Sequence, residues 1–133
     1  MKILFVCKHN RFRSKVAEAY FNKINKNKNI KVASAGIFKG FPTEPIVVKI
    51  GKRYGLNINK NTNGLKEEAV KKIDLLIIVA NDVPAYLFKS KVKNILVWKI
   101  RDANSLDKKE IEKIMKKIFK KIDELNRKIG KLK

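Results

Sequence analysis

Residues 3–24 read ILFVCKHNRFRSKVAEAYFNKI and combine two structural signals in one short stretch. The first is a continuous apolar run, Ile3–Val6, of the kind found in strands that are buried on both faces of a parallel sheet. The second is an amphipathic helical pattern, with apolar residues at positions 16, 19, 20 and 24. A mostly polar turn lies between them. We therefore expect a buried strand, a turn and a helix that begins near Lys15.

Strand and helix signals alternate along the rest of the chain. Short apolar runs occur at Ile30–Ala35, Leu75–Ala80 and Ile95–Trp98, and helical patterns occur at Ile46–Tyr54 and Ile111–Ile129. The last of these has Lys, Glu and Asp between its apolar positions, which predicts a long amphipathic helix packed on the sheet. The alternation predicts an α/β fold: a doubly wound four-stranded parallel sheet flanked by helices.

The length and composition indicate one domain that spans residues 1–133. Of the 133 residues, 44% are hydrophobic, which is enough for a single core. The Asn- and Gly-rich stretch Gly55–Gly64 is interpreted as an exposed loop rather than a linker between domains. The apolar run from Ile3 to Cys7 is too short for a signal peptide or for the roughly 20 residues of a membrane span. We therefore expect a cytoplasmic protein without membrane association.

The net charge and the cysteine count limit the kinds of ligand and metal site that we expect. The chain carries 33 Lys and Arg against 12 Asp and Glu, and its net charge of +21 attracts phosphates, nucleic acids and anionic membranes without specifying any of them. A single cysteine excludes an internal disulfide and a cysteine-rich zinc site, and a single His disfavours other zinc sites. We expect no metal and no cofactor, and one thiol, Cys7, remains to be explained.

Cys7 and Arg13 belong to a C-x5-R-S sequence that ends at Ser14 and runs into the predicted helix. Ligand sites in open α/β sheets lie beyond the carboxyl ends of the strands, which is where this loop begins. The five intervening residues let the backbone curl so that successive N–H groups converge on one point, and the helix adds its positive N-terminal end. The loop after the first strand therefore predicts a site for a tetrahedral phosphate.

Cys7 is placed for in-line attack on the phosphorus of such a bound phosphate. The helix N-terminus and Arg13 favour its thiolate, which is the nucleophilic form. Arg13 can span two phosphate oxygens, Ser14 can bond the thiolate, and Asn10 tolerates a left-handed backbone. A lone Cys at a strand end is more commonly a small buried hydrophobe, and C-x5-R also occurs by chance. The position between a first strand and a helix favours the catalytic hypothesis.

The stretch ILFVCKHNRFRSKVAEAYF resembles the opening of the low-molecular-weight protein tyrosine phosphatases, a family related in fold to the thioredoxin-linked arsenate reductases. Ser34-Ala35-Gly36, Asp74-Leu75-Leu76-Ile77 and the six residues from Trp98 to Ala103 extend the resemblance over nearly the whole chain. The resemblance implies hydrolysis of phosphotyrosine-type phosphomonoesters in protein substrates. It also implies a cysteinyl-phosphate intermediate and a reaction that needs no metal or cofactor.

The resemblance assigns a role to each matching position. It implies that the catalytic residues are Cys7 as nucleophile, Arg13 as phosphate ligand and Asp102 as general acid. It further implies that Asn10 holds the shape of the loop and that Ser14 assists the thiolate. The residues that it implies for phosphate binding are Lys8, His9, Asn10, Arg11, Phe12, Arg13 and Ser14.

The position after the general acid departs from the family pattern. Ala103 stands where the family usually has Pro, so the loop that holds Asp102 is expected to be less rigid. Asp102 could instead cap a loop or pair with a Lys. Asp82 and Asp107 are therefore alternative acids.

Two positions in the loop also depart from the pattern. His9 replaces a Gly and is interpreted as a residue at the rim of the pocket. Phe12 replaces a second loop Cys, so Cys7 has no disulfide partner. No cysteine lies near the third strand either, which disfavours thioredoxin-linked arsenate reduction.

Phe38 and Phe41 are candidates for an aromatic wall beside a phosphotyrosyl ring, or for packing beneath a loop.

Two other classes of function compete with the phosphatase hypothesis. A basic nucleic-acid-binding module would explain the charge, but the basic residues are mostly Lys spread along the chain and no nucleic-acid-binding motif is present. A phosphocarrier would also keep a Cys after its first strand, but Arg13 and Asp102 favour hydrolysis. A nucleotide-binding P-loop is excluded because no G-x-x-x-x-G-K-[ST] occurs. We expect no specific nucleic-acid partner, and the sequence leaves the oligomeric state open.

Overall fold

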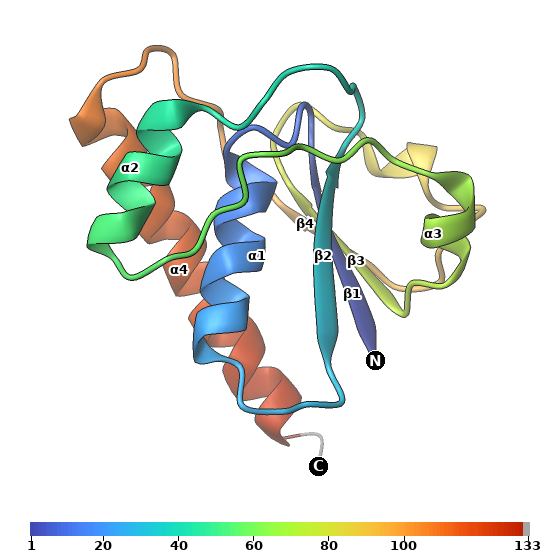
Figure 1. The fold of residues 1–133 in the computed structure, drawn as a ribbon. Helices are drawn as coiled ribbons and strands as arrows, with labels where there is room; N and C mark the ends of the chain where they lie inside the picture. Colours follow the sequence, from blue (N-terminus) through green and yellow to red (C-terminus); the bar gives the residue numbers. More distant parts are fainter. Residues whose placement is uncertain (132–133) are drawn as a thin grey trace.

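The fold is a four-stranded parallel sheet with helices on both faces (Figure 1). The computed structural model describes residues 1–131. The strand order is β2-β1-β3-β4, and each neighbouring pair is parallel, which confirms the predicted doubly wound α/β fold. The elements in chain order are β1 (Lys2–Cys7), α1 (Arg13–Ile24), β2 (Lys31–Gly36), α2 (Pro45–Arg53), α3 (Glu67–Lys71), β3 (Leu75–Val79), the 3-10 turn η1 (Ala85–Leu87), β4 (Ile95–Trp98) and α4 (Lys108–Lys131).

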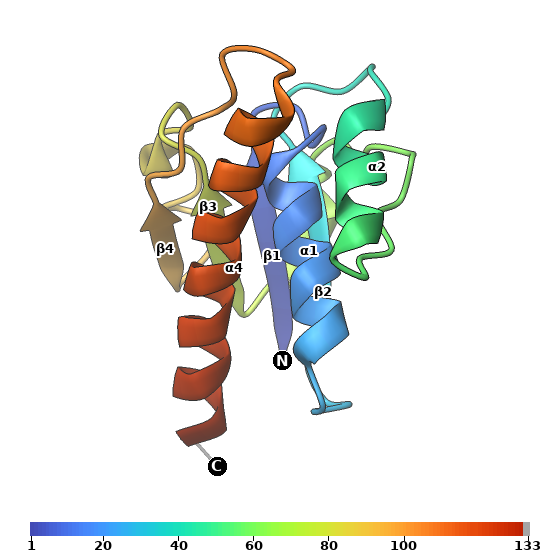
Figure 2. The same ribbon diagram turned by 90° about the vertical axis from the view of Figure 1, so that its left-hand side faces the viewer.

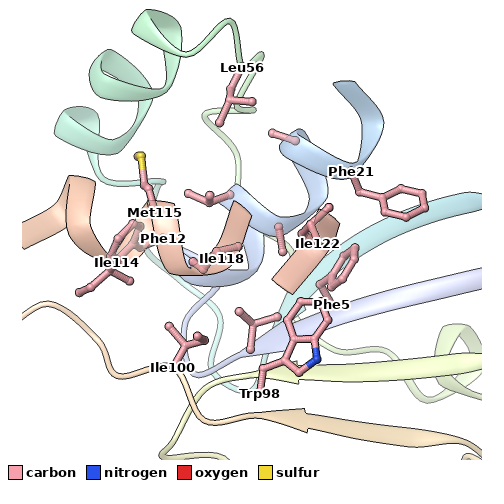
Figure 3. Close-up of a cluster of buried hydrophobic side chains, with 14 of the residues drawn as sticks. Phe5, Phe12, Phe21, Leu56, Trp98, Ile100, Ile114, Met115, Ile118 and Ile122 are labelled. Atoms are coloured by element: carbon pink, nitrogen blue, oxygen red, sulfur yellow. The ribbon is translucent and has the colours of Figure 1, made fainter. Parts of the chain in front are cut away.

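The larger core lies between the sheet and the layer formed by α1, α2 and α4 (Figure 2). The ring of Phe5 in β1 lies 6.3 Å from that of Phe21 in α1 and 6.1 Å from that of Trp98 in β4, measured between centroids (Figure 3). α4 adds an apolar stripe at spacings of three and four residues, which includes the fully buried Ile118 and Ile122. Each such side chain contributes about 2 kcal/mol of hydrophobic stabilisation.

α3 and η1 cover the other face of the sheet, over a smaller core. Leu4 and Val6 of β1 pack there with Val70 of α3 and with Phe88, which follows η1. The sequence does not predict either element, because five and three residues are too few to show a helical period. Within the described chain, none of the helices is both long and apolar enough to cross a membrane.

The stretch Gly55–Gly64 contains no helix or strand, but the prediction that it is exposed is wrong for its apolar residues. Leu56 and Ile58 are 3% and 5% exposed and belong to the larger core. Both side chains therefore point into the core rather than into solvent. The loop is therefore anchored to the domain, and its last residue forms an isolated parallel bridge with Gly36.

β1 and β2 end side by side, and this fixes where the loop after β1 lies. Cys7 is paired with Gly36 across the two strands. A Cβ at Gly36 would come within 2.5 Å of the carbonyl carbon of His9, so only glycine lets the loop cross the end of β2. The N–H of Phe38 then donates to the carbonyl oxygen of Lys8 at 2.9 Å. The predicted phosphate loop thus rests on the carboxyl ends of two adjacent strands.

Candidate active site

The loop between β1 and α1 curls around Asn10. This residue has a φ of 58°, and within the described chain it is the one non-glycine residue with a positive φ. Its buried side chain donates from Nδ2 to the hydroxyls of Ser14 at 2.7 Å and Ser34 at 2.9 Å. Its Oδ1 accepts a hydrogen bond from the N–H of Asn63 at 2.8 Å. Asn10 therefore holds the loop in a left-handed turn that few other residues tolerate.

Cys7 ends β1 beneath this loop and is 2% exposed. Its Sγ lies 2.9 Å from the Oγ of Ser14 in the first turn of α1. Because the Ser14 oxygen already accepts a hydrogen bond from Asn10, its own hydrogen is free to point at the sulfur. Ser34 likewise accepts from Asn10 and donates to Glu18 at 2.5 Å. Either atom can donate in the contact between Cys7 and Ser14, and the hydrogen bonds that Asn10 gives to both serines leave the Ser14 hydroxyl able to donate to the sulfur.

Arg13 begins α1, and its side chain is 1% exposed. It donates to the carbonyl oxygen of Ile100 at 3.0 Å and contacts both carboxylate oxygens of Asp82, at 3.1 and 3.4 Å. Asp102 lies farther away, with its Oδ2 at 3.8 Å from Nη2 of Arg13. The loops that follow β3 and β4 therefore both converge on this guanidinium.

A cavity of about 120 Å³ opens beside the nucleophile candidate. The sequence-predicted site residues that line it are Cys7, His9, Arg11, Phe12, Arg13 and Asp102. The other lining residues are Glu44, Val47, Ala103, Leu106 and Ile111. Lys8, Asn10 and Ser14 lie outside the lining, and the last two shape the loop through hydrogen bonds.

The three candidate acids have different surroundings. Asp102 lines the cavity. Asp82 is bound to Arg13 outside the lining, and the carbonyl of Asp107 accepts the N–H of Ile111 at the start of α4. Among residues 1–131, no group of three His, Cys, Asp or Glu side chains is placed to hold a metal ion. Asp102 is therefore the one of the three that can reach a ligand in the cavity.

One side of the cavity is bordered by the segment that precedes α2. Arg11 forms a 2.6 Å ion pair with Glu44, and its guanidinium carbon lies 5.4 Å from the ring centroid of Phe41. The ring of His9 lies against that of Phe38 in a tilted arrangement, with centroids 5.7 Å apart and an angle of 36° between the ring planes. The two phenylalanines are 55% and 61% exposed, so they flank cavity-lining side chains rather than packing beneath a loop.

The sequence profile of the family described as low molecular weight phosphotyrosine protein phosphatase matches residues 2–133. The chain belongs to this family. It is a phosphatase that acts on phosphomonoesters, and the family implies phosphoprotein substrates. The predicted family and enzyme class are confirmed. A search of curated proteins found no match.

Solved structures of three kinds resemble this phosphatase. A low molecular weight protein tyrosine phosphatase from T. tengcongensis is 30% identical over 96% of this chain and 99% of its own, with a TM-score of 0.78. An arsenate reductase from Archaeoglobus fulgidus is 26% identical over 93% of this chain and 98% of its own, also with a TM-score of 0.78. An arginine phosphatase from Geobacillus stearothermophilus is 21% identical, covers 98% and 93% of the two chains with a TM-score of 0.83, and supports the common fold alone.

The phosphatase carries a second buried basic side chain near the nucleophile candidate. Lys15 is 2% exposed, and its burial lowers its pKa, an effect that the charges of Glu18 and Cys7 oppose. The first turn of α1 contains no acidic residue. The same turn holds two buried basic residues, Arg13 and Lys15. This excess of positive charge adds to the positive end of the helix and favours an anion there.

Several partners of the phosphatase site are not apparent from its sequence. Ser34 matches a family motif, yet nothing local indicates that it bonds Asn10 or Glu18. The sequence analysis weighs Asp82 only as an alternative acid, whereas the structure makes it the ion-pair partner of Arg13. Its position just after β3, next to β1, was the available signal.

Proposed function

We propose that this phosphatase hydrolyses phosphotyrosine-type monoesters through a cysteinyl-phosphate on Cys7. One observation carries the proposal: Cys7, hydrogen-bonded by Ser14 at 2.9 Å, shares a single cavity with Arg13 and Asp102. The N–H groups of residues 8–13 and the N-terminus of α1 bind the phosphate oxygens, and Arg13 spans two of them. The chemistry uses these side chains and water, without a metal or a cofactor.

In the first step the thiolate of Cys7 attacks phosphorus. The S–P bond forms as the bond from phosphorus to the leaving oxygen breaks. Asp102, protonated at this stage, gives its proton to that oxygen, and the tyrosyl hydroxyl departs. Arg13 and the loop amides hold the charge that collects on the equatorial oxygens in the transition state.

In the second step water releases the phosphate. Asp102, now a carboxylate, takes a proton from the water as its oxygen attacks phosphorus. The S–P bond breaks, inorganic phosphate leaves, and Cys7 returns to the thiolate that Ser14 stabilises. Each proton taken up by Asp102 is the one given away in the next cycle.

The cavity walls favour an aromatic leaving group. Val47, Leu106 and Ile111 supply apolar surface beside the polar loop. A guanidino leaving group, as in the substrate of an arginine phosphatase, would need a free acid at the mouth. Of the two acids that line the cavity, Glu44 is already paired with the protein's own Arg11 at 2.6 Å and Asp102 is assigned to proton transfer, which supports an aryl substrate over a guanidino one.

Arsenate reduction is the second chemistry found on this fold. A thiol relay needs a second cysteine to attack the first. The 133 residues contain one cysteine, and Phe12 occupies the neighbouring loop position. The single thiol supports hydrolysis over reduction.

The decisive experiment compares wild type with Cys7→Ser on p-nitrophenyl phosphate. The serine variant should lose essentially all turnover, yet still bind phosphate or vanadate, because Arg13 and the loop amides are unchanged. Wild-type turnover should be unchanged by EDTA. Substantial turnover by Cys7→Ser would refute the covalent mechanism, and EDTA sensitivity would indicate a different enzyme class.

The substrate class is tested with matched peptides that carry phosphotyrosine or phosphoarginine at the same position. We expect the higher kcat/KM on phosphotyrosine. A preference for phosphoarginine would contradict the proposed substrate but leave the Cys7 chemistry intact.

A further inference from the structure

Asp102 has little of its own to hold it in place. Its side chain is 50% exposed; among the described residues its Oδ1 accepts only the neighbouring N–H of Ala103, at 2.9 Å, and Arg13 is 3.8 Å away. The residue after it is Ala103 rather than a proline that would restrict the backbone. A general acid must nevertheless stay within hydrogen-bond reach of the leaving oxygen. Some other group must therefore fix this loop.

Glu110 in the first turn of α4 contacts the loop on both sides of Asp102. Its Oε1 accepts hydrogen bonds from Nη1 of Arg101 at 2.6 Å and from the N–H of Asn104 at 2.8 Å. Its Oε2 accepts the hydroxyl of Ser105 at 3.2 Å. The same Nη1 of Arg101 also donates to the carbonyl oxygen of Asp102 at 3.2 Å. One carboxylate thus ties residues 101, 104 and 105 to α4.

The ionised form of Glu110 is the one that these contacts select. The N–H of Asn104 lowers the pKa of the carboxyl group most, and the hydrogen bond from Arg101 lowers it further. The carboxylate also lies near the positive end of α4, where a negative charge is favoured. Glu110 is therefore an ionised carboxylate, and each of its two oxygens accepts at least one hydrogen bond from the loop.

We propose that Glu110 is a positioning residue for the general acid: it fixes the loop of Asp102 in place of the missing proline. The proposal rests on the proposed function, in which Asp102 protonates the leaving oxygen. Glu110 does not line the cavity beside Cys7. Its removal should therefore weaken acid catalysis without affecting the attack by Cys7.

Leaving-group dependence separates this role from a general structural one. Phosphotyrosine has a poor leaving group that needs the proton, whereas p-nitrophenyl phosphate has an activated one that needs it little. Glu110→Ala should lower kcat/KM on a phosphotyrosyl peptide by roughly tenfold and kcat/KM on p-nitrophenyl phosphate by about twofold or less, because kcat/KM reports only the steps up to release of the leaving group and not the later hydrolysis of the shared cysteinyl-phosphate. Glu110→Gln, which keeps the shape and loses the charge, should show a smaller loss with the same selectivity.

The matched control is Glu112→Ala, two residues along the same helix. Glu112 binds the hydroxyl of Tyr54 at 2.8 Å and Arg53 at 3.7 Å and does not contact the loop. Glu112→Ala should leave the ratio of kcat/KM on the phosphotyrosyl peptide to kcat/KM on p-nitrophenyl phosphate at the wild-type value. If Glu110→Ala fails to fold, as judged by thermal unfolding, Glu110→Gln decides the test.

A double-mutant cycle with Asp102→Asn completes the test. In the Asp102→Asn background, Glu110→Ala should cause no further selective loss, because the acid that it positions is already gone. Equal losses on both substrates, or a full additional loss in that background, would overturn the positioning role alone. If Asp102→Asn itself shows no leaving-group selectivity, the acid assignment of the proposed function fails, and the role of Glu110 fails with it.

Discussion

Arg13 is the side chain on which the polar contacts of the site converge. Its guanidinium is buried, held by a carbonyl oxygen of Ile100 and by both oxygens of Asp82. A planar group fixed at its terminal nitrogens can present a second edge to phosphate, whereas an ammonium cannot span two acceptors. The geometry of the group therefore matters as well as its charge.

Arg13→Lys should consequently lose most of the activity although the charge is kept. We expect kcat/KM for p-nitrophenyl phosphate to fall by about a hundredfold, the scale seen when one preorganised charge-stabilising donor is removed. Arg53→Lys is the control, because Arg53 is half-exposed and pairs loosely with Glu112 at 3.7 Å, and it should behave as wild type. A loss of only about twofold in Arg13→Lys would mean that Arg13 belongs to the general basic field.

How far the site could be predicted depends on how local each contact is. Cys7, Asn10 and Arg13 follow from the spacing within one loop, since a strand, a curled backbone and a helix N-terminus are set by neighbouring residues. Asp82 meets Arg13 from 69 residues away, and only because β3 lies beside β1. Asn63 meets Asn10 across 53 residues for the same kind of reason. Such partners need the sheet order, which no local pattern contains.

At the scale of the elements, the strands could be predicted because three of them are continuous apolar runs. β1 and β3 are buried on both faces, and their residues show no alternation. β4 was also predicted, although Leu96 and Val97 are 42% and 43% exposed at the edge of the sheet. α3 could not be predicted, because its five residues gain their stability from the packing of Val70 rather than from a pattern.

The contact that Glu110 makes between the 101–105 loop and α4 should stabilise the protein less at low pH. The folded-state pKa of Glu110 is lowered from its ordinary value of 4.5, so its stabilising contribution is complete above that pH. The contribution is lost as the pH falls through the lowered pKa. In thermal unfolding, wild type should exceed Glu110→Gln at pH 7, and the difference should shrink steadily below pH 4.5.

Glu124→Gln removes the same charge from the same helix away from the loop and serves as the control. Its difference from wild type should not follow the pattern of Glu110→Gln. If the difference in unfolding temperature between wild type and Glu110→Gln stays constant from pH 7 to below pH 4.5, the contact does not depend on an ionised Glu110.

At the scale of the whole molecule, the positive charge is mostly unpaired. Among the lysines whose side chains the structure describes, within residues 1–130, Lys91 is the only one that forms an ion pair, with Glu67 at 3.0 Å. The outer face of α4 is densely basic and exposed, with lysines at 109, 113, 116, 117, 120 and 121. Much of the net charge of +21 therefore acts as a long-range field rather than through local contacts.

This field should favour acidic substrates in a way that salt removes. The Debye length falls from about 30 Å at 0.01 M to about 8 Å at 0.15 M ionic strength, so lysines distant from the cavity stop acting on a substrate over that range. kcat/KM for a phosphotyrosyl peptide with acidic flanking residues should fall by about tenfold across it, through KM and with little change in kcat. A peptide with neutral flanks should lose much less.

A charge-reversal variant separates the remote field from the phosphate loop. Lys113→Glu, Lys116→Glu and Lys120→Glu together change exposed residues of α4 that do not line the cavity. The triple variant should show a flatter salt dependence with the acidic peptide and an unchanged kcat on p-nitrophenyl phosphate. If its salt dependence equals that of wild type, or if both peptides respond equally to salt, the attraction comes only from the charges beside Cys7. The lysine-rich surface would then have no part in substrate capture.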